Sequence, residues 1–209
     1  MRRIYKLKRV CFQECLVIIG CIVLMLAFFN TPGMGDVNIW IKWMKYAGEN
    51  GIIKGYALQG DMYPPLALVL QIFLKNICPF LSDFQVLRIV NIFFLLITVL
   101  IIQVLFKNSK VSLLVYGGLM LSMNIGYLDI EICPFLILAF YFLSIDKYVL
   151  SGIFFSILCL IKFQPLIIMP FVCLFFVDIF WMDRHKFSIK IRRKDLLKVG
   201  MPAFLLGGF

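Results

Sequence analysis

The feature that most constrains this chain is an uncharged stretch of 18 residues from Ile89 to Phe106. As a helix, this stretch would rise about 27 Å, close to the thickness of the bilayer's hydrocarbon core. Hydrophobic residues make up 63% of the 209 residues, charged residues make up 15%, and the mean hydropathy is +0.99. A soluble domain carries about a quarter charged residues. The sequence therefore predicts a polytopic membrane protein of the all-α class, with no soluble catalytic domain.

Apolar runs separated by short polar segments predict the individual spans. The first run follows a basic N-terminus and is long enough to cross, with no cleavage site of small residues after it, so we predict an uncleaved signal anchor. The predicted spans, within one transmembrane domain over residues 1–209, are 11–29, 89–106, 111–127, 131–145, 148–162, 165–181 and 197–209. Because the last run stops at Phe209, we expect the chain to be the N-terminal part of a longer module.

The outer loop at 30–88 is the long polar passage between the first two spans. Trp40, Trp43, Met44 and Ala47 recur at helical spacing, which predicts an amphipathic helix at 37–50, lying in the membrane interface. A second apolar run in the loop, at residues 66–76, would rise only about 16 Å as a helix. It is therefore predicted to be a juxtamembrane helix that does not cross.

The distribution of positive charge supports this assignment of spans. With 66–76 not crossing, the cytoplasmic segments hold 15 of the 21 lysines and arginines, as the positive-inside rule expects. These segments are 1–10, 107–110, 146–147 and 182–198. The net charge of +10 is thus explained by membrane topology, and no nucleic-acid partner is predicted. The chain is expected in the cell membrane with its N-terminus in the cytoplasm.

The cysteines and the histidine give little sign of chemistry. The seven cysteines lie in or beside apolar runs and form no CxxC pair, so they are interpreted as small apolar residues. The single histidine, His185, excludes a histidine-rich metal site within this chain.

Under this topology, polar residues from several segments meet on the outer face. They are Asp36, Asp61 and Tyr63 in the first loop, Arg88 before the second span, Asp129 and Glu131 in the next outer turn, and Lys162 before Pro165. Ionisable groups at membrane depth are costly, and they commonly have a partner or a function.

The order of these features resembles that of the GT-C glycosyltransferases, membrane enzymes that take a sugar from a polyprenyl-phosphate carrier. An acidic first outer loop with two interfacial helices includes Tyr63-Pro64-Pro65. An arginine then opens the next span, followed by an acidic second outer loop, Gly126 to Glu131, and a lysine in Ile161-Lys162-Phe163-Gln164-Pro165. The mannosyltransferase-like bacterial group is the most similar. The resemblance implies a GT-C-like helical bundle that works on the extracytoplasmic face of the cell envelope.

The resemblance also implies roles for individual residues. Asp36 matches the acid that acts as general base on an acceptor hydroxyl in an inverting displacement. Lys162 and Arg88 would bind the carrier phosphate, and Tyr63 would shape its entrance. Asp129 and Glu131 match the second-loop acid, which orients the acceptor or, in some relatives, a divalent cation. The acceptor would be a glycan, a lipid or a protein. The sequence itself requires no cofactor.

One departure from the family pattern concerns the donor. Relatives that use an aminoarabinose donor carry a lysine directly before the double proline, where this chain has Tyr63. That departure argues against such a donor.

Each candidate also has a local explanation. Asp36 suits the N-cap of a helix, and Asp61 suits a turn. The Asp129/Glu131 pair suits a helix start, whereas Arg88 and Lys162 suit interfacial anchors whose charged ends reach water.

Two other functions stay open beside the transferase. A transporter or flippase would place ionisable residues and broken helices near the middle of the membrane, whereas the predicted span interiors are almost uncharged. A non-catalytic, truncated membrane subunit is the other alternative.

Overall fold

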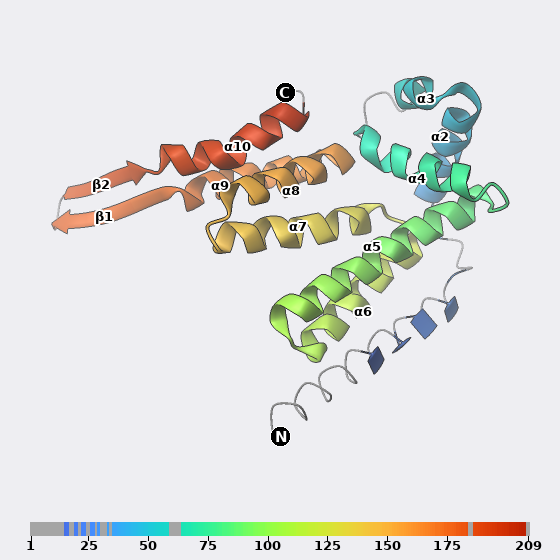
Figure 1. Ribbon diagram of the computed structural model, residues 1–209, viewed down its shortest axis with the longest axis horizontal. Helices are drawn as coiled ribbons and strands as arrows, with labels where there is room; N and C mark the ends of the chain where they lie inside the picture. Colours follow the sequence, from blue (N-terminus) through green and yellow to red (C-terminus); the bar gives the residue numbers. More distant parts are fainter. Residues whose placement is uncertain are drawn as a thin grey trace. The chain divides into compact units, whose positions relative to one another are not determined.

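The computed structural model describes residues 35–58, 64–183 and 186–207, together with a few positions between 15 and 33. The chain divides into two compact units, Met1–Ile137 and Leu138–Phe209. Both are built mainly from helices, so the prediction of a helical fold is confirmed in this coarse form (Figure 1). The predicted helix at 11–29 lies largely outside the described residues, and the single transmembrane domain stays a prediction.

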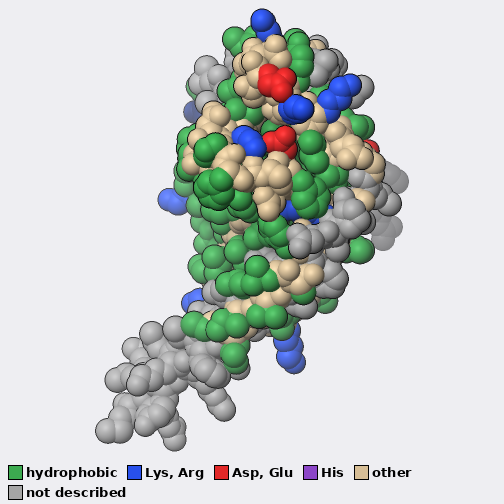
Figure 2. Space-filling model, turned by 90° about the vertical axis from the view of Figure 1, so that its right-hand side faces the viewer, with side chains coloured by type: hydrophobic (Ala, Val, Ile, Leu, Met, Phe, Trp, Pro, Cys, Tyr) green, Lys and Arg blue, Asp and Glu red, His purple; other side chains and the backbone are tan. Residues whose placement is uncertain are grey.

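The continuously described part of the first unit starts with two short helices, α2 (Asp36–Asn50) and α3 (Ile52–Leu58). The apolar stripe predicted for α2 is confirmed, and the helix starts one residue before the predicted 37–50. Trp40 and Trp43 are buried on this stripe, with their rings edge to face at 5.0 Å. On the side of the molecule that carries these helices, charged side chains of both signs gather on the upper part, among hydrophobic ones (Figure 2).

Helix α3 was not predicted from the sequence. It follows Gly51, whose positive φ of 90° ends α2 and turns the chain. A Cβ added at Gly55 would overlap with the Ala47 methyl group and backbone, so the two helices touch where both residues are small. This close packing, rather than any amphipathic pattern, holds α3 in place.

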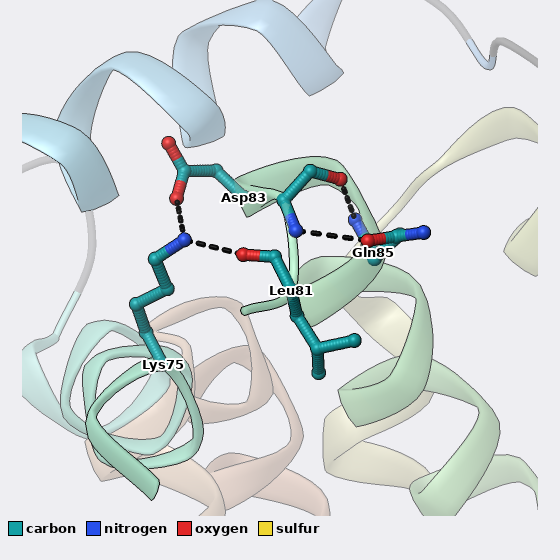
Figure 3. Close-up of polar contacts among 5 residues, drawn as sticks. Lys75, Leu81, Asp83 and Gln85 are labelled. Atoms are coloured by element: carbon teal, nitrogen blue, oxygen red, sulfur yellow. Dashed lines mark hydrogen bonds and ion pairs between the residues drawn. The ribbon is translucent and has the colours of Figure 1, made fainter. Parts of the chain in front are cut away.

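The next pair of helices, α4 (Pro65–Ile77) and α5 (Asp83–Phe106), meets at a tight turn. Helix α4 agrees with the predicted 66–76. Helix α5 starts six residues before the predicted 89–106 because Ser82 and Gln85 form a capping box. Lys75 fastens the turn by pairing with Asp83 at 3.1 Å and by donating to the Leu81 carbonyl (Figure 3).

Among the described residues, α5 alone is long and apolar enough to cross a membrane. It has 24 residues, whereas α4, α8 and the Gln164–Phe175 stretch are apolar but shorter. This helix is compatible with location in a membrane, and the number of crossings stays a prediction.

Helices α6 (Ser109–Ile125) and α7 (Asp129–Ser144) follow. Only Lys107 and Asn108 separate α5 from α6, and Lys107 adopts the left-handed conformation, with φ 50°. The core of the first unit gathers apolar side chains from α5, α6 and the start of α7, with two partly buried leucines from α4 against it. Its buried members are Val90, Phe94, Leu95, Val99, Tyr116, Met120, Met123 and Ile130.

The second unit contains the end of α7 and the elements that follow it. These are α8 (Tyr148–Ile161), the 3-10 helix η1 (Gln164–Ile168), α9 (Met169–Phe175), the strands β1 (Val177–Asp183) and β2 (Lys186–Ile191), and α10 (Arg193–Gly207). Gly152 of α8 packs directly on the backbone of Val199 in α10, because no Cβ stands between them. The boundaries of the helices predicted at 111–127, 131–145 and 148–162 are confirmed to within two residues at each end.

The continuous helix predicted at 165–181 is wrong. Pro165 and Pro170 lie in the first turns of two short helices, and α9 ends at Phe175. Proline is favoured at a helix start, where its missing N–H costs no hydrogen bond, and both prolines occupy such positions here. Strand β1 follows and pairs antiparallel with β2.

The prediction that the basic segment 182–198 forms a loop is also wrong. The segment contributes the rest of the hairpin and the start of α10. Arg192 closes the base of the hairpin: its backbone N–H donates to the Phe176 carbonyl at 2.9 Å, and its guanidinium donates to the Phe175 carbonyl at 2.7 Å.

Candidate functional site

Asp36 is the first residue of α2, and its side chain is exposed. Gly35 occupies the N-cap position and makes no side-chain cap. The local explanation of Asp36 as an N-cap is therefore wrong, although its charge still favours the positive end of the helix. An exposed carboxylate at this position is available to a ligand.

The turn between α6 and α7 packs against the start of α2. Gly126 ends α6 with a positive φ of 89°, and a Cβ built on it would overlap with the side chain of Val37. Asp129 follows three residues later as the first residue of α7, and it is half-buried. The contact at Gly126 therefore brings together the two acidic segments that contain Asp36 and Asp129, as the sequence analysis expected.

Arg88 lies inside the first unit and is only 1% exposed. Its guanidinium donates to the carbonyl oxygens of Met123 and Asn124, the latter at 3.3 Å, and lies over the Phe84 ring at 5.1 Å. The last carbonyls of a helix lack partners within the helix and carry partial negative charge. Arg88 thus caps the C-terminus of α6. Its predicted contact with a carrier phosphate stays a prediction.

Glu131 is completely buried near the start of α7. The Gln71 side chain of α4 faces its carboxyl group, without reaching normal hydrogen-bond geometry. Neither carboxyl oxygen has a hydrogen-bond partner among the described residues. Glu131 therefore points into the protein in this structure, in contrast to the half-buried Asp129.

Lys162 belongs to the second unit, where it directly follows α8. It is 7% exposed, and its backbone N–H donates to the Leu158 carbonyl at 3.1 Å. Its predicted part in phosphate binding remains a prediction. Asp61, Tyr63 and His185 lie outside the described residues.

Two buried amides were missed by the sequence analysis. Gln71 is 1% exposed and Asn91 is fully buried, and polar atoms of both lack hydrogen-bond partners in the described part of the chain. Each lies within an apolar run, Gln71 within 65–77 and Asn91 within 89–106. An amide inside such a run is the signal that could have revealed them, because burying it without a partner is costly.

The described residues fit a metal centre poorly. Across residues 35–58, 64–183 and 186–207, no three His, Cys, Asp or Glu side chains come together. The cysteines in the described part, Cys15, Cys78, Cys133, Cys159 and Cys173, are free. The divalent cation that the resemblance left open is therefore assigned no step in the reaction.

A groove of about 860 Å³ lies at the far end of α2 from Asp36. It is lined mainly by Ala47, Ile52, Ile53 and Ile72, with Lys54 among its polar residues. Ala47 lies eleven positions after Asp36 in α2, or about 16 Å along the helix axis. The groove is therefore separate from the acidic segments around Asp36.

Together, these observations define a candidate site in the first unit. An exposed aspartate at the start of α2 lies beside a turn that leads to a second aspartate, and the buried Arg88 fixes the helix before that turn. Comparison with protein-family models, curated proteins and solved structures finds no match to this chain.

Proposed function

We propose that this chain is a membrane glycosyltransferase that moves a sugar from a polyprenyl-phosphate carrier to an acceptor hydroxyl. The observation that carries the proposal is the contact between Val37 and Gly126. It brings an exposed carboxylate, Asp36, close to the turn that precedes Asp129. Acids from two segments about 90 residues apart are expected where one group takes a proton while another orients the acceptor.

Asp36 is the proposed general base. Its carboxylate takes the proton from the acceptor hydroxyl while that oxygen forms a bond to the anomeric carbon of the sugar. The bond from that carbon to the carrier phosphate oxygen breaks, and polyprenyl phosphate leaves with the electron pair. Attack from the opposite side inverts the anomeric configuration. Asp129 is proposed to hold the acceptor through its other hydroxyl groups.

The leaving phosphate gains negative charge in this displacement, so the site needs a cation near it. The roles of Lys162 in binding this phosphate and of Tyr63 in shaping its entrance are carried over from the resemblance alone. Arg88 is proposed to contribute chiefly through α6, since its guanidinium already donates to the Met123 and Asn124 carbonyls.

The proposed location is the cell membrane, with several spans and the site on the extracytoplasmic face. The length and composition of α5 support a membrane span. The excess of lysine and arginine in the segments assigned to the cytoplasm supports the orientation. The predicted non-crossing position of α4 keeps Asp36 and Asp129 on the same side.

The test is sugar transfer by the full chain in membranes, with polyprenyl-phosphate mannose and polyprenyl-phosphate glucose, each labelled in the sugar, as donors. We expect labelled product from the wild-type chain, and a loss of at least 100-fold in Asp36→Asn, because general-base catalysis contributes about 10²–10⁴-fold. The release of free polyprenyl phosphate should fall in parallel.

Glu49→Gln is the matched control, because Glu49 is another exposed acid on the same helix. This variant should keep full activity and the same amount of protein in the membrane. Full transfer by Asp36→Asn would rule out Asp36 as the base. Movement of the labelled lipid across the membrane without transfer would favour the flippase, and no activity with any donor would favour a non-catalytic subunit.

A further inference from the structure

A buried acid–amide pair joins α4 to the start of α7. Glu131 is 0% exposed and Gln71 is 1% exposed, and their side chains lie near each other without a hydrogen bond between them in this structure. The neighbours of these residues in sequence, Leu70 and Ile130, belong to or pack on the apolar core of the first unit. The pair therefore borders this core, next to which the sequence also places another buried amide, Asn91.

No cation within the described residues is paired with Glu131. Lys75, on the same helix as Gln71, pairs with Asp83 and donates to the Leu81 carbonyl. Arg88 of α5 donates to carbonyls at the end of α6. The lysines of the helices packed on α4, namely Lys42, Lys45 and Lys54, are exposed, as is Glu49. The acids Asp36 and Asp129 would not stabilise a second negative charge.

An ionised carboxylate buried without a partner is very costly, and such a group takes up a proton instead. Protonation also supplies a second kind of donor, an O–H, beside the unpaired N–H groups of Gln71. A carboxyl O–H can donate to the amide oxygen of Gln71 while an N–H of Gln71 donates to the carboxyl C=O. An ionised Glu131 would instead have no O–H to donate, so only one-way hydrogen bonds from Gln71 could form.

We propose that Glu131 is held as a neutral carboxylic acid in a two-point hydrogen bond with Gln71, and that this pair positions the turn between α6 and α7. The turn contacts α2 at Val37 and leads to Asp129. Glu131 is then a positioning residue, in place of the acceptor-binding role implied by the resemblance. Only its effect on catalysis rests on the proposed function.

The protonation state can be tested directly by infrared spectroscopy of the full chain, purified in detergent at neutral pH. The difference spectrum between the wild-type chain and Glu131→Gln should contain the C=O stretch of a protonated carboxyl group. The same band should remain in Asp129→Asn, the control in which a half-buried acid of the same helix is removed. Loss of an ionised carboxylate band in Glu131→Gln would overturn the proposal.

The pairing can be tested by thermal unfolding. Glu131→Gln keeps a neutral donor and acceptor, so its midpoint should stay within about 2 °C of the wild-type value. Glu131→Ala and Gln71→Ala should each unfold about 5 °C lower or more, and the double variant should lose less than the sum. A Glu131→Gln variant that does not fold, or that is as unstable as Glu131→Ala, would overturn the proposal.

Sugar transfer provides the readout for positioning. Glu131→Gln should retain transfer, whereas Glu131→Ala should lose it even at a temperature where it stays folded. Loss of transfer in a stable, folded Glu131→Gln would mean that the acid contacts the substrate, and would overturn the positioning role. If the wild-type chain transfers no sugar, the proposed function fails, while the spectra and unfolding still decide the state of the pair.

Discussion

Val37 of α2 packs against Gly126 in the turn between α6 and α7, so closely that this glycine has no room for a side chain. The two residues are far apart in sequence, and their contact fixes the geometry of the candidate site. Asp36 precedes Val37 directly, and Asp129 follows Gly126 by three residues. A change at this contact should therefore affect stability and activity together.

Gly126→Ala should destabilise the first unit for two reasons. The positive φ of 89° costs an alanine about 1–2 kcal/mol, and overlap with Val37 adds about 1–3 kcal/mol. The midpoint of thermal unfolding in detergent should fall by roughly 5–15 °C. Adding Val37→Ala to this variant should recover the stability lost through overlap. It should not recover the stability lost through the positive φ.

Gly117→Ala is the control for that experiment. Gly117 is an exposed residue of α6 with open space around its Cα. The midpoint of thermal unfolding of Gly117→Ala should therefore equal the wild-type value or lie slightly above it. An equal fall of the unfolding midpoint in both variants would show that the Val37–Gly126 contact does not contribute specifically to stability.

Arg88→Lys separates a structural role of this arginine from a role in phosphate binding. A lysine keeps the charge but not the fork of donors that reaches two carbonyls, so we expect a loss of about 1.5–3 kcal/mol in unfolding free energy. Arg193→Lys, a change at an exposed position, should have no such effect. An unchanged stability with a raised KM for the donor would instead favour direct contact with the carrier phosphate.

The orientation of the chain can be tested with cysteines placed at exposed positions in a cysteine-depleted background. Ile53 of α3 is 87% exposed, and Ile53→Cys should react with an impermeant thiol reagent added from outside. Lys110→Cys, at the start of α6, should react only after permeabilisation. Gly55 is unsuitable for labelling because a side chain there would overlap with Ala47. The reverse pattern would contradict the orientation drawn from positive charge.

Many of the helices could be predicted, because the periodicity and the length of the apolar runs indicate them. The stripe of α2 at Trp40, Trp43, Met44 and Ala47 is an example, since a spacing of three and four residues determines which face is buried. The start of α5 could have been predicted better, because Ser82 followed three residues later by Gln85 is a capping-box signal.

Other parts depend on contacts that no local pattern reveals. Helix α3 packs where Gly55 meets Ala47, and Glu131 is completely buried although it stands beside the half-buried Asp129 in sequence. The hairpin at 177–191 was missed because apolar, β-branched and aromatic residues suit a strand as well as a helix. Of the candidate site, the meeting of the two acidic segments could be foreseen, whereas the cap that Arg88 makes on α6 could not.

The two-residue connection between α5 and α6 bears on how this protein folds. Closing a loop this short costs little chain entropy, and the contacts it allows are close in sequence. We therefore expect the α5–α6 pair to assemble early, as soon as both helices have left the ribosome. The earlier helices α2 and α4 would then dock onto a preformed surface, so that the candidate site is completed only in the later steps of folding.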